Sequence, residues 1–332
     1  MKLTRISVLS ISIALLSGLT VAPNAMGALA GTNDITVYSA GPKGLADKLA
    51  QAFEKKTGIK VEMFQSTTGK ILGRLEAEQA NPQADVVVLA DWSAASTLAS
   101  EGWAYAFKPK NANELIWKDK NDRYFAYSAS ALGITYNTKL VKNPPKTWSD
   151  VAKAAWKGKV VMPDPSQSGS AVDFVGGYLQ NRKSGWTLFK SLKNNGLVVQ
   201  GANADALDQV LTGAKSMVLA GVDYMAYADK KKGEPVNIVY PSDGTVVNPR
   251  PVLILKSTHH LKDAEAFVNF LLSNEGQKIV EKAFLLPGRK DIPANPKRES
   301  LNKIHSWGVN WNQLAKNKKS ILSEFNVIFN GQ

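Results

Sequence analysis

Segments of strand character and of helix character alternate along the first part of the chain, and this order restricts the folds that it can adopt. Three β-rich segments enclose two segments of helical periodicity, in the order 34–38, 42–56, 59–64, 71–80 and 85–89. The last of them is almost continuously apolar, which is typical of a strand covered on both faces. A β-α-β-α-β order of this kind predicts a parallel sheet with helices on both sides.

A second series of the same kind follows. Strands are expected at 131–136, 159–162, 216–219 and 252–255. Helices are expected at 171–180, 185–193, 204–211, 224–231, 264–272, 277–284 and 313–329. Two successive α/β series in 332 residues predict two lobes. Small ligands of such sheets bind at the carboxyl ends of the strands, where loops lead into helices, so candidate site residues are expected in those loops.

Composition fits a folded protein and argues against a nucleic-acid partner. The hydrophobic fraction is 44% and the formal net charge is +13. A clustered charge of that size binds nucleic acid or a membrane surface, but the lysines here are scattered and their longest run is 230–232. No recognised nucleic-acid-binding motif accompanies them, so we interpret the charge as a solvated surface.

The N-terminus is typical of a secretory signal peptide. MKLTR carries two positive charges, an uncharged apolar stretch follows, and Ala28-Leu29-Ala30 has the small-x-small pattern of a cleavage site. We expect a signal peptide over residues 1–30 and an exported, soluble mature chain. The alternative, a membrane anchor, needs a longer apolar stretch. The chain has no cysteine, which excludes disulfides, thiolate metal sites and cysteine nucleophiles.

A catalytic set is hard to assemble from this sequence. The three histidines, His259, His260 and His305, belong to no metal-spaced or nucleophile-elbow motif. The acidic residues are dispersed, without a pair that spacing alone would place in one pocket. We therefore expect a binding protein without a catalytic site, a cofactor or a resident metal.

The stretch FQSTTGK, at 64–70, resembles the end of a phosphate-binding P-loop. The full motif needs a glycine five places before the glycine of GK, and a serine or threonine after the lysine. This chain has Phe64 and Ile71 at those places, so the motif fails at both ends and nucleotide hydrolysis is not expected. A polar loop that enters a helix still offers free backbone N–H groups and hydroxyls, which suit an anion without catalysis.

Five strand-end loops share this composition, because each is small, polar and placed at a helix entrance. The candidates for ligand binding in these loops are Ser39, Gly41, Ser66, Thr67, Thr68, Asp91, Trp92, Ser168, Gly169, Ser170 and Asn203. Such residues also occur there simply as helix caps, and Asn203 is the natural N-cap of the segment that follows it. Five such loops on two facing lobes predict a cleft with backbone donors and positive helix ends, suited to an anionic ligand.

Several segments together resemble the periplasmic solute-binding proteins of ABC importers. They are VYSAGPKGLADKLAQAFEKKTGIKVEMF, NPQADVVVLAD, SALGITYNTKLV, WKGKVVMPDPSQSGSAVDF and AEAFVNFLLSNEGQKIV, and they cover most of residues 34–293. The resemblance implies the type II-like periplasmic binding protein fold. In that fold, two α/β lobes with mostly parallel sheets are joined by crossing strands, close on a ligand in the cleft between them, and dock on a membrane permease.

The resemblance also implies an organisation and partners. Residues 31–130 and 251–295 form a first lobe, 131–250 form a second lobe, and 296–332 form C-terminal helices that pack on a lobe. The protein is then a periplasmic monomer. Its partners are a small anionic solute and an inner-membrane ABC permease, with no nucleic acid among them.

Within this family the chain is similar to the ferric-binding and to the organophosphate- or phosphonate-binding proteins, and both ligands stay open. Ferric binders usually carry an adjacent Tyr-Tyr pair and a histidine after the first strand, whereas this chain has Tyr224-Met225 and Gly41-Pro42. Iron(III) prefers phenolate and carboxylate oxygens, for which Tyr136 and Tyr224 are the candidates. The hydroxyl-rich loops at 66–68 and 168–170 fit a phosphate or phosphonate better.

The other end of such a solute needs contacts of its own. Asp91, Asp223 and Trp92 are expected to read an amine or sugar hydroxyls there, and Tyr224 is expected to contact the ligand. Core packing is an equally good interpretation of Trp92. A third function, from another class, is a secreted hydrolase.

Overall fold

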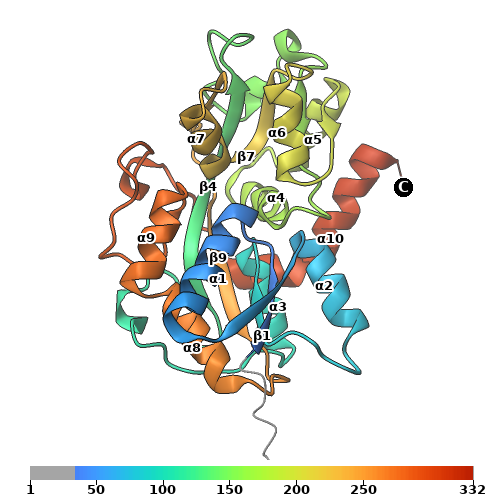
Figure 1. Cartoon of the computed structure of the whole chain (residues 1–332). Coiled ribbons are helices and arrows are strands. Elements are labelled where there is room, and N and C mark those ends of the chain that lie inside the picture. Colours follow the sequence, from blue (N-terminus) through green and yellow to red (C-terminus); the bar gives the residue numbers. More distant parts are fainter. Residues whose placement is uncertain (1–33, 332) are drawn as a thin grey trace, which may run out of the picture. The chain divides into compact units, whose positions relative to one another are not determined.

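The computed structural model describes residues 34–331, so the predicted signal peptide (1–30) lies outside the described residues. Figure 1 shows an α/β structure in which strands run through the middle and helices cover them. None of the helices in this part of the chain is both long enough and apolar enough to cross a bilayer.

Strands form at every place where the sequence predicts one. Their bounds are β1 Asp34–Ser39, β2 Lys60–Gln65, β3 Val86–Val88, β4 Phe125–Asn137, β5 Val160–Met162, β6 Val198–Val199, β7 Met217–Val222, β8 Val236–Val239, β9 Val247–Ile254 and β10 Leu286–Pro287. The sequence patterns do not predict the short strands β6, β8 and β10. β4 and β9 are longer than predicted, and both lie in the middle of the sheet.

The helices predicted from apolar periodicity are all present. Their bounds are α1 Lys43–Thr57, α2 Thr68–Ala77, α4 Gly169–Asn181, α5 Trp186–Asn194, α6 Asn203–Leu211, α7 Asp223–Lys231, α8 Leu261–Leu271, α9 Asn274–Lys282 and α10 Trp311–Asn330. A further helix, α3 Trp92–Ser100, is not predicted by the sequence patterns. α1 illustrates the cause, because the apolar stripe of Leu45, Leu49 and Phe53 is buried against the sheet. It ends at Gly58, whose φ of 77° is the left-handed conformation that glycine adopts without strain.

Two groups of parallel strands are joined by two antiparallel strands. The strand order is β2-β1-β3-β9-β4-β7-β5-β6, and β8 and β10 also pair with β4. β1 is parallel to β2 and β3, and β5 is parallel to β6 and β7, as the alternating sequence predicts. β9 and β4 lie between the groups and are antiparallel to their neighbours. The two-lobed α/β fold with crossing strands is therefore confirmed.

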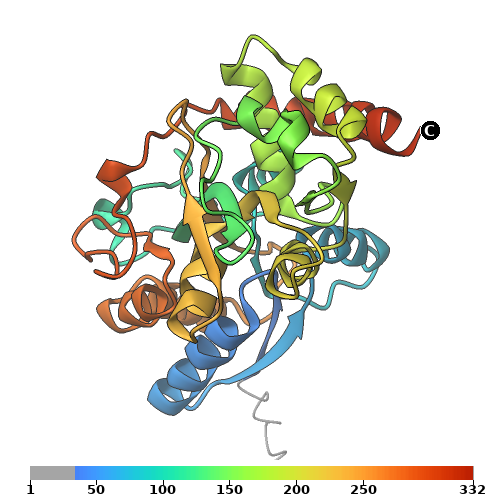
Figure 2. The same cartoon turned by 90° about the horizontal axis from the view of Figure 1, so that it is seen from above.

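β4 pairs with strands on both sides of the junction between the two groups. Its first half pairs with β9 over 125–131, and its second half pairs with β7 and β8 over 132–137. The predicted lobe boundaries near 130 and 250 fall inside β4 and β9, and they stay predictions. α10 packs against α3 beside the first group and against α4 and α5 beside the second. Figure 2 shows the red α10 passing beside the yellow-green α4 and α5. Because α10 contacts helices of both groups, the assignment of 296–332 to one lobe stays a prediction.

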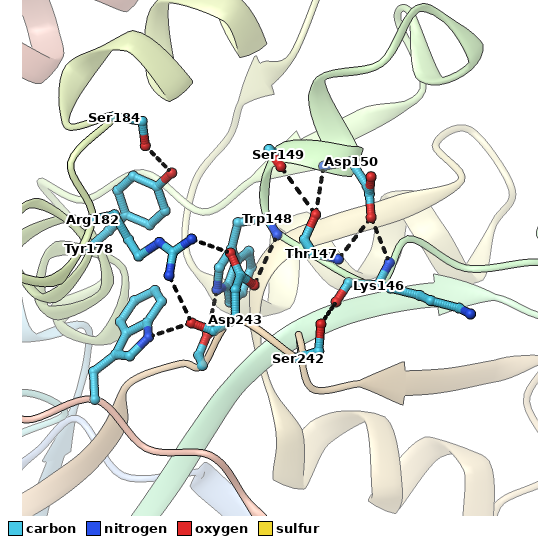
Figure 3. A network of polar contacts seen from close by, with 12 residues as sticks. Lys146, Thr147, Trp148, Ser149, Asp150, Tyr178, Arg182, Ser184, Ser242 and Asp243 are labelled. Carbon is cyan, nitrogen blue, oxygen red and sulfur yellow. Dashed lines mark hydrogen bonds and ion pairs between the residues drawn. The ribbon is translucent and has the colours of Figure 1, made fainter.

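A buried polar and aromatic network fixes the end of α4 and the turn before β9. Trp148 is completely buried, and its Nε1 donates to the Gly244 carbonyl oxygen at 2.7 Å. Figure 3 shows Arg182, directly after α4, reaching Asp243, whose Oδ2 lies 3.3 Å from Nη2. Gly244 has a φ of 93°, and a side chain there would collide with Trp307, so this turn requires glycine.

Candidate functional site

A cavity of about 290 Å³ lies where strand ends of both groups lead into helices. Its wall consists of Ala40, Gly41, Pro42, Lys43, Ser66, Thr67, Thr68, Ala90, Gln167, Ser168, Gly169, Ala202, Asn203, Ala204, Tyr224, Met225 and Arg250. Most of these residues follow the carboxyl ends of β1, β2, β3, β5, β6 and β7, where ligands of α/β sheets bind. The predicted ligand-binding residues in the wall are Gly41, Ser66, Thr67, Thr68, Ser168, Gly169, Asn203 and Tyr224.

Five helices begin at this cavity. α1, α2, α4, α6 and α7 each place a first-turn residue in its wall. The first N–H groups of an α-helix have no acceptor within the helix, and the helix dipole adds partial positive charge at the same end. The convergence of five such ends makes the cavity a favourable place for a negative charge.

Two hydroxyls in the wall cap the helices that they precede. Thr67 Oγ1 accepts a hydrogen bond from Lys70 N at 3.4 Å, and Ser168 Oγ accepts one from Ala171 N at 3.3 Å. A hydroxyl that accepts a hydrogen bond keeps its own proton to donate. Capping and ligand binding, which the sequence presents as alternatives, are therefore compatible roles for these side chains.

Arg250 is a buried, charged residue of the wall that sequence reasoning missed. It lies within β9, is only 1% exposed, and donates from Nη2 to the Ala40 carbonyl oxygen at 2.8 Å. Its Nε and Nη1 have no hydrogen-bond partner among the described residues. A buried cation without a counter-charge is unfavourable, because it loses water and gains no partner. The signal in the sequence is a lone arginine between two prolines, directly before an apolar run.

Tyr224 lies beside Arg250 and completes this side of the wall. The guanidinium carbon is 5.6 Å from the centre of the Tyr224 ring, which is a cation–π distance. Burial raises the pKa of the Tyr224 phenol. The phenol is therefore protonated at neutral pH and acts as a hydrogen-bond donor rather than as a phenolate.

Ser39 and Ser170 are placed behind the wall rather than in it. Ser39 is buried, and its Oγ accepts from the Gly41 backbone N–H at 3.1 Å. Ser170 is fully buried, and its Oγ accepts from Asn203 Nδ2 at 3.1 Å. These hydroxyls hold residues of the cavity wall in place through hydrogen bonds.

The structure does not bring Asp91 and Trp92 to the cavity. Asp91 is completely buried, and its Oδ2 lies 2.7 Å from the Nζ of Lys318 in α10. Trp92 packs in the core, with its ring centre 4.7 Å from that of Tyr124. Neither residue is in the described wall of the cavity, because one is engaged in an internal ion pair and the other in core packing. Their contact with the far end of the ligand stays a prediction.

Asp223 is also used inside the protein. Its Oδ2 accepts from Arg298 Nη2 at 2.6 Å and from the Tyr240 hydroxyl at 2.9 Å, and both members of the ion pair are fully buried. It opens α7, but it is not in the cavity wall. Removing its carboxylate from this pair to contact a ligand would leave the Arg298 cation buried and unpaired.

Asn203 is in the cavity wall, but its position in α6 differs from the predicted one. The N-cap of α6 is Ala202, whose backbone N–H donates to Asp205 Oδ2 at 2.7 Å, and Asn203 is the first residue of the helix. The prediction of Asn203 as the N-cap is wrong by one position. Its amide, freed from capping, bonds to Ser170 and faces the wall.

The residues proposed for iron are not brought together. Tyr224 lies in the cavity wall, whereas Tyr136 is near the far end of β4, where its hydroxyl accepts from Asn237 Nδ2 at 3.4 Å. Within residues 34–331 no group of three or more His, Cys, Asp and Glu residues is placed to hold a metal ion. The three histidines lie outside the cavity wall, and His305 Nδ1 contacts the Ser242 carbonyl oxygen instead.

Comparisons with known proteins agree with this geometry. Residues 81–317, well over half of the chain, match a family described as bacterial extracellular solute-binding proteins. A Salmonella typhimurium protein, named as a candidate 2-aminoethylphosphonate-binding periplasmic protein, is 26% identical over 342 residues that cover 99% of both chains. The major ferric iron-binding protein of Neisseria meningitidis is 28% identical over 278 residues, covering 79% of this chain and 81% of its own.

Solved structures show the same fold. The periplasmic binding protein AfuA of Actinobacillus pleuropneumoniae, with fructose-6-phosphate bound, has a TM-score of 0.82 at 22% identity, over 90% of this chain and 98% of AfuA. The family match, the two-lobed fold and the cavity agree with one another. The chain belongs to the bacterial extracellular solute-binding proteins and is a solute-binding component of an ABC importer.

Proposed function

We propose that this protein is a periplasmic receptor that captures a small organic phosphate or phosphonate and delivers it, unchanged, to an inner-membrane ABC permease. The observation that carries the proposal is Arg250. Its guanidinium lies in the cavity wall almost without exposure, and two of its nitrogens have no hydrogen-bond partner within residues 34–331. In this proposal the receptor acts as a monomer.

The geometry of a guanidinium favours a tetrahedral oxyanion. Its planar fork of N–H groups binds two oxygens of a phosphate or carboxylate side by side. A phosphate or phosphonate has a third oxygen, which needs further donors. Ser66, Thr67 and Thr68, the first residue of α2, lie in the same wall and carry hydroxyl donors for it.

The energetics point in the same direction. Burial of an ion in a protein costs on the order of several kcal/mol when no partner compensates it. An anion in the cavity would give Nε and Nη1 of Arg250 the acceptors that they lack among the described residues. The printed names of the relatives support this class, because one refers to a phosphonate and one solved structure contains a sugar phosphate.

Iron(III) is the alternative, because one relative is named for ferric iron. A hard cation of this kind prefers several anionic oxygens. The described part of the chain places no Asp or Glu in the cavity wall and one phenol, that of Tyr224, whose raised pKa keeps it protonated. The donor set of the wall therefore fits an anionic solute better than a metal ion.

Thermal-shift measurements on the mature protein test the proposal. Methylphosphonate and glycerol phosphate are expected to raise the melting temperature, because a ligand that binds only the native state stabilises it by mass action. The Arg250→Met variant should lose this response. Lys48→Met is the control, since it removes one exposed positive charge of α1 outside the cavity wall. An absence of any response to phosphorus compounds, with a visible absorption band on adding iron(III), would overturn the proposal.

A further inference from the structure

The charges around the cavity are unbalanced. Among residues 34–331, its wall contains two cations, Lys43 and Arg250, and no carboxylate. Five helix N-termini add partial positive charge to the same space. This distribution suits an anionic group of the ligand. The described wall has no group that would compensate a positive charge elsewhere on the same ligand.

On the basis of the proposed function, we infer that the solute carries its phosphate or phosphonate on an uncharged, hydroxyl-bearing tail, and that the cavity rejects the ammonium group of an aminoalkylphosphonate. The sequence-based expectation that Asp91, Asp223 and Trp92 read an amine or sugar hydroxyls leaves both kinds of tail open, and the inference selects the hydroxyls. It also separates this chain from the ligand that gives one of its relatives its name.

The carboxylates next to the wall are occupied by donors of their own segments. Asp47 pairs with Lys43 Nζ at 3.3 Å. Asp164 accepts from Ser166 N at 2.8 Å. Asp205 caps α6 through Ala202 N. None of the three is in the wall, so none of them offers a free carboxylate to an ammonium in the cavity.

The buried carboxylates closest to the site are no better placed. Asp91 Oδ2 is paired with Lys318 and Asp223 Oδ2 is paired with Arg298, whereas Oδ1 of each is buried without a hydrogen-bond partner among the described residues. Neither residue is in the described wall of the cavity, so a ligand ammonium could reach these oxygens only if the wall rearranged. A ligand hydroxyl bonds to the groups of the wall as they stand.

The wall offers groups that suit hydroxyls instead. The side-chain amides of Gln167 and Asn203 and the hydroxyl of Ser66 lie around the cavity. Amides and hydroxyls both donate and accept hydrogen bonds, as a hydroxyl on the ligand does. An ammonium only donates, and it would face the guanidinium and the helix N-termini, which have the same sign of charge.

Isothermal titration with two ligands of equal length tests the inference. 2-Hydroxyethylphosphonate and 2-aminoethylphosphonate differ only in the terminal group, and the amine is protonated at pH 7. We expect the hydroxyl compound to bind at least tenfold more tightly. Equal or tighter binding of the amino compound would overturn the inference while leaving the proposed function intact. If neither compound binds, and methylphosphonate and inorganic phosphate do not bind either, the proposed function itself fails.

A variant with one added carboxylate sharpens the test. Asn203→Asp places a negative charge in the wall at the first turn of α6, where an acidic residue is well tolerated. The tenfold preference for the hydroxyl compound should shrink or reverse in this variant. Asn81→Asp is the matched control, because Asn81 is exposed and lies outside the cavity wall, and its preference should stay as in the wild type. An unchanged preference in Asn203→Asp would contradict the inference.

Discussion

Arg250 and Arg298 are both almost fully buried, but within the described chain only Arg298 has a carboxylate at ion-pair distance. Arg250→Met removes an unpaired cation and one hydrogen bond to a backbone carbonyl. We expect the free energy of unfolding of the ligand-free protein to rise by about 1–3 kcal/mol, because the buried charge no longer has to be desolvated. Urea denaturation measures this change. A loss of stability would show that Arg250 is already compensated in the free protein.

The same substitution at Arg298 should have the opposite effect. Arg298 Nη2 pairs with Asp223 Oδ2 at 2.6 Å, and Nη1 donates to the Phe284 carbonyl oxygen at 2.6 Å. Arg298→Met leaves a buried carboxylate without its partner, which costs about 3–5 kcal/mol. Denaturation curves of the two arginine variants, measured in parallel, form a matched pair. Similar changes in the free energy of unfolding of the two variants would contradict the assignment of Arg250 as the cation that binds the ligand.

Local sequence predicts the hydroxyl residues of the site well, because each belongs to a loop that is recognisable by itself. Ser66, Thr67 and Ser168 directly precede helices, and that context places them at the cavity. Long-range partners are not visible in this way. Asp91 pairs with a lysine 227 residues away, and Asp223 pairs with an arginine 75 residues away. A sequence pattern contains no information on such pairs, so both carboxylates look free for a ligand.

At the scale of elements, the crossing strands are the parts that the sequence predicts least completely. The β-rich pattern predicts 131–136 and 252–255, whereas β4 begins at Phe125 and β9 begins at Val247. Pro249 and Pro251 argue against a strand, since proline cannot donate to a sheet ladder. β3 ends opposite Val252, so this stretch of β9 has only β4 as its strand partner. Arg250 lies between the two prolines, which is why it was not predicted as a site residue.

The junction of α3 and α4 depends on one buried carboxyl and gives a pH prediction. Asp173 accepts from Trp92 N at 3.1 Å and from Ser93 Oγ at 2.8 Å. Burial, and then the charge of Asp91, raise the pKa of Asp173 well above its usual value, and Lys318 opposes this. A carboxyl with a raised pKa binds its proton more readily in the folded state. Its stabilising contribution is complete below the unfolded pKa of about 3.9 and is lost as the pH rises through the folded pKa.

Asp173→Asn imitates the protonated carboxyl at every pH. The free energy of unfolding of the wild type, minus that of this variant, should therefore fall as the pH rises above about 4. Asp150→Asn is the control of opposite sign, because the hydrogen bond from Lys153 lowers the pKa of Asp150 to about 2. There the difference should rise between about pH 2 and 4. Urea titrations across this range measure both, and a flat difference for Asp173→Asn contradicts the prediction.

At the scale of the whole described chain, the two strand groups meet closely at one glycine beside the cavity. Gly69 is in the first turn of α2, which follows β2, and the loop that precedes α4 passes directly over it. A Cβ at this position would collide with the Ser166 carbonyl oxygen, and Gly69 N lies 3.5 Å from the Gln167 carbonyl oxygen. The backbone approach that closes the cavity is thus available only to glycine.

Gly69→Ala is therefore expected to hinder closure of the cleft without unfolding either strand group. Alanine is the better helix former by up to about 1 kcal/mol, so the free energy of unfolding should stay near its original value. The affinity for a phosphonate should fall at least tenfold, a loss of about 1.4 kcal/mol, because the anion can no longer be enclosed from both sides. Gly73→Ala is the matched control on the same helix, since a Cβ there meets nothing within 4 Å. Titration calorimetry on both variants separates the two outcomes: equal affinities would mean that ligand capture does not require this approach, and that the cavity binds its solute from one strand group alone.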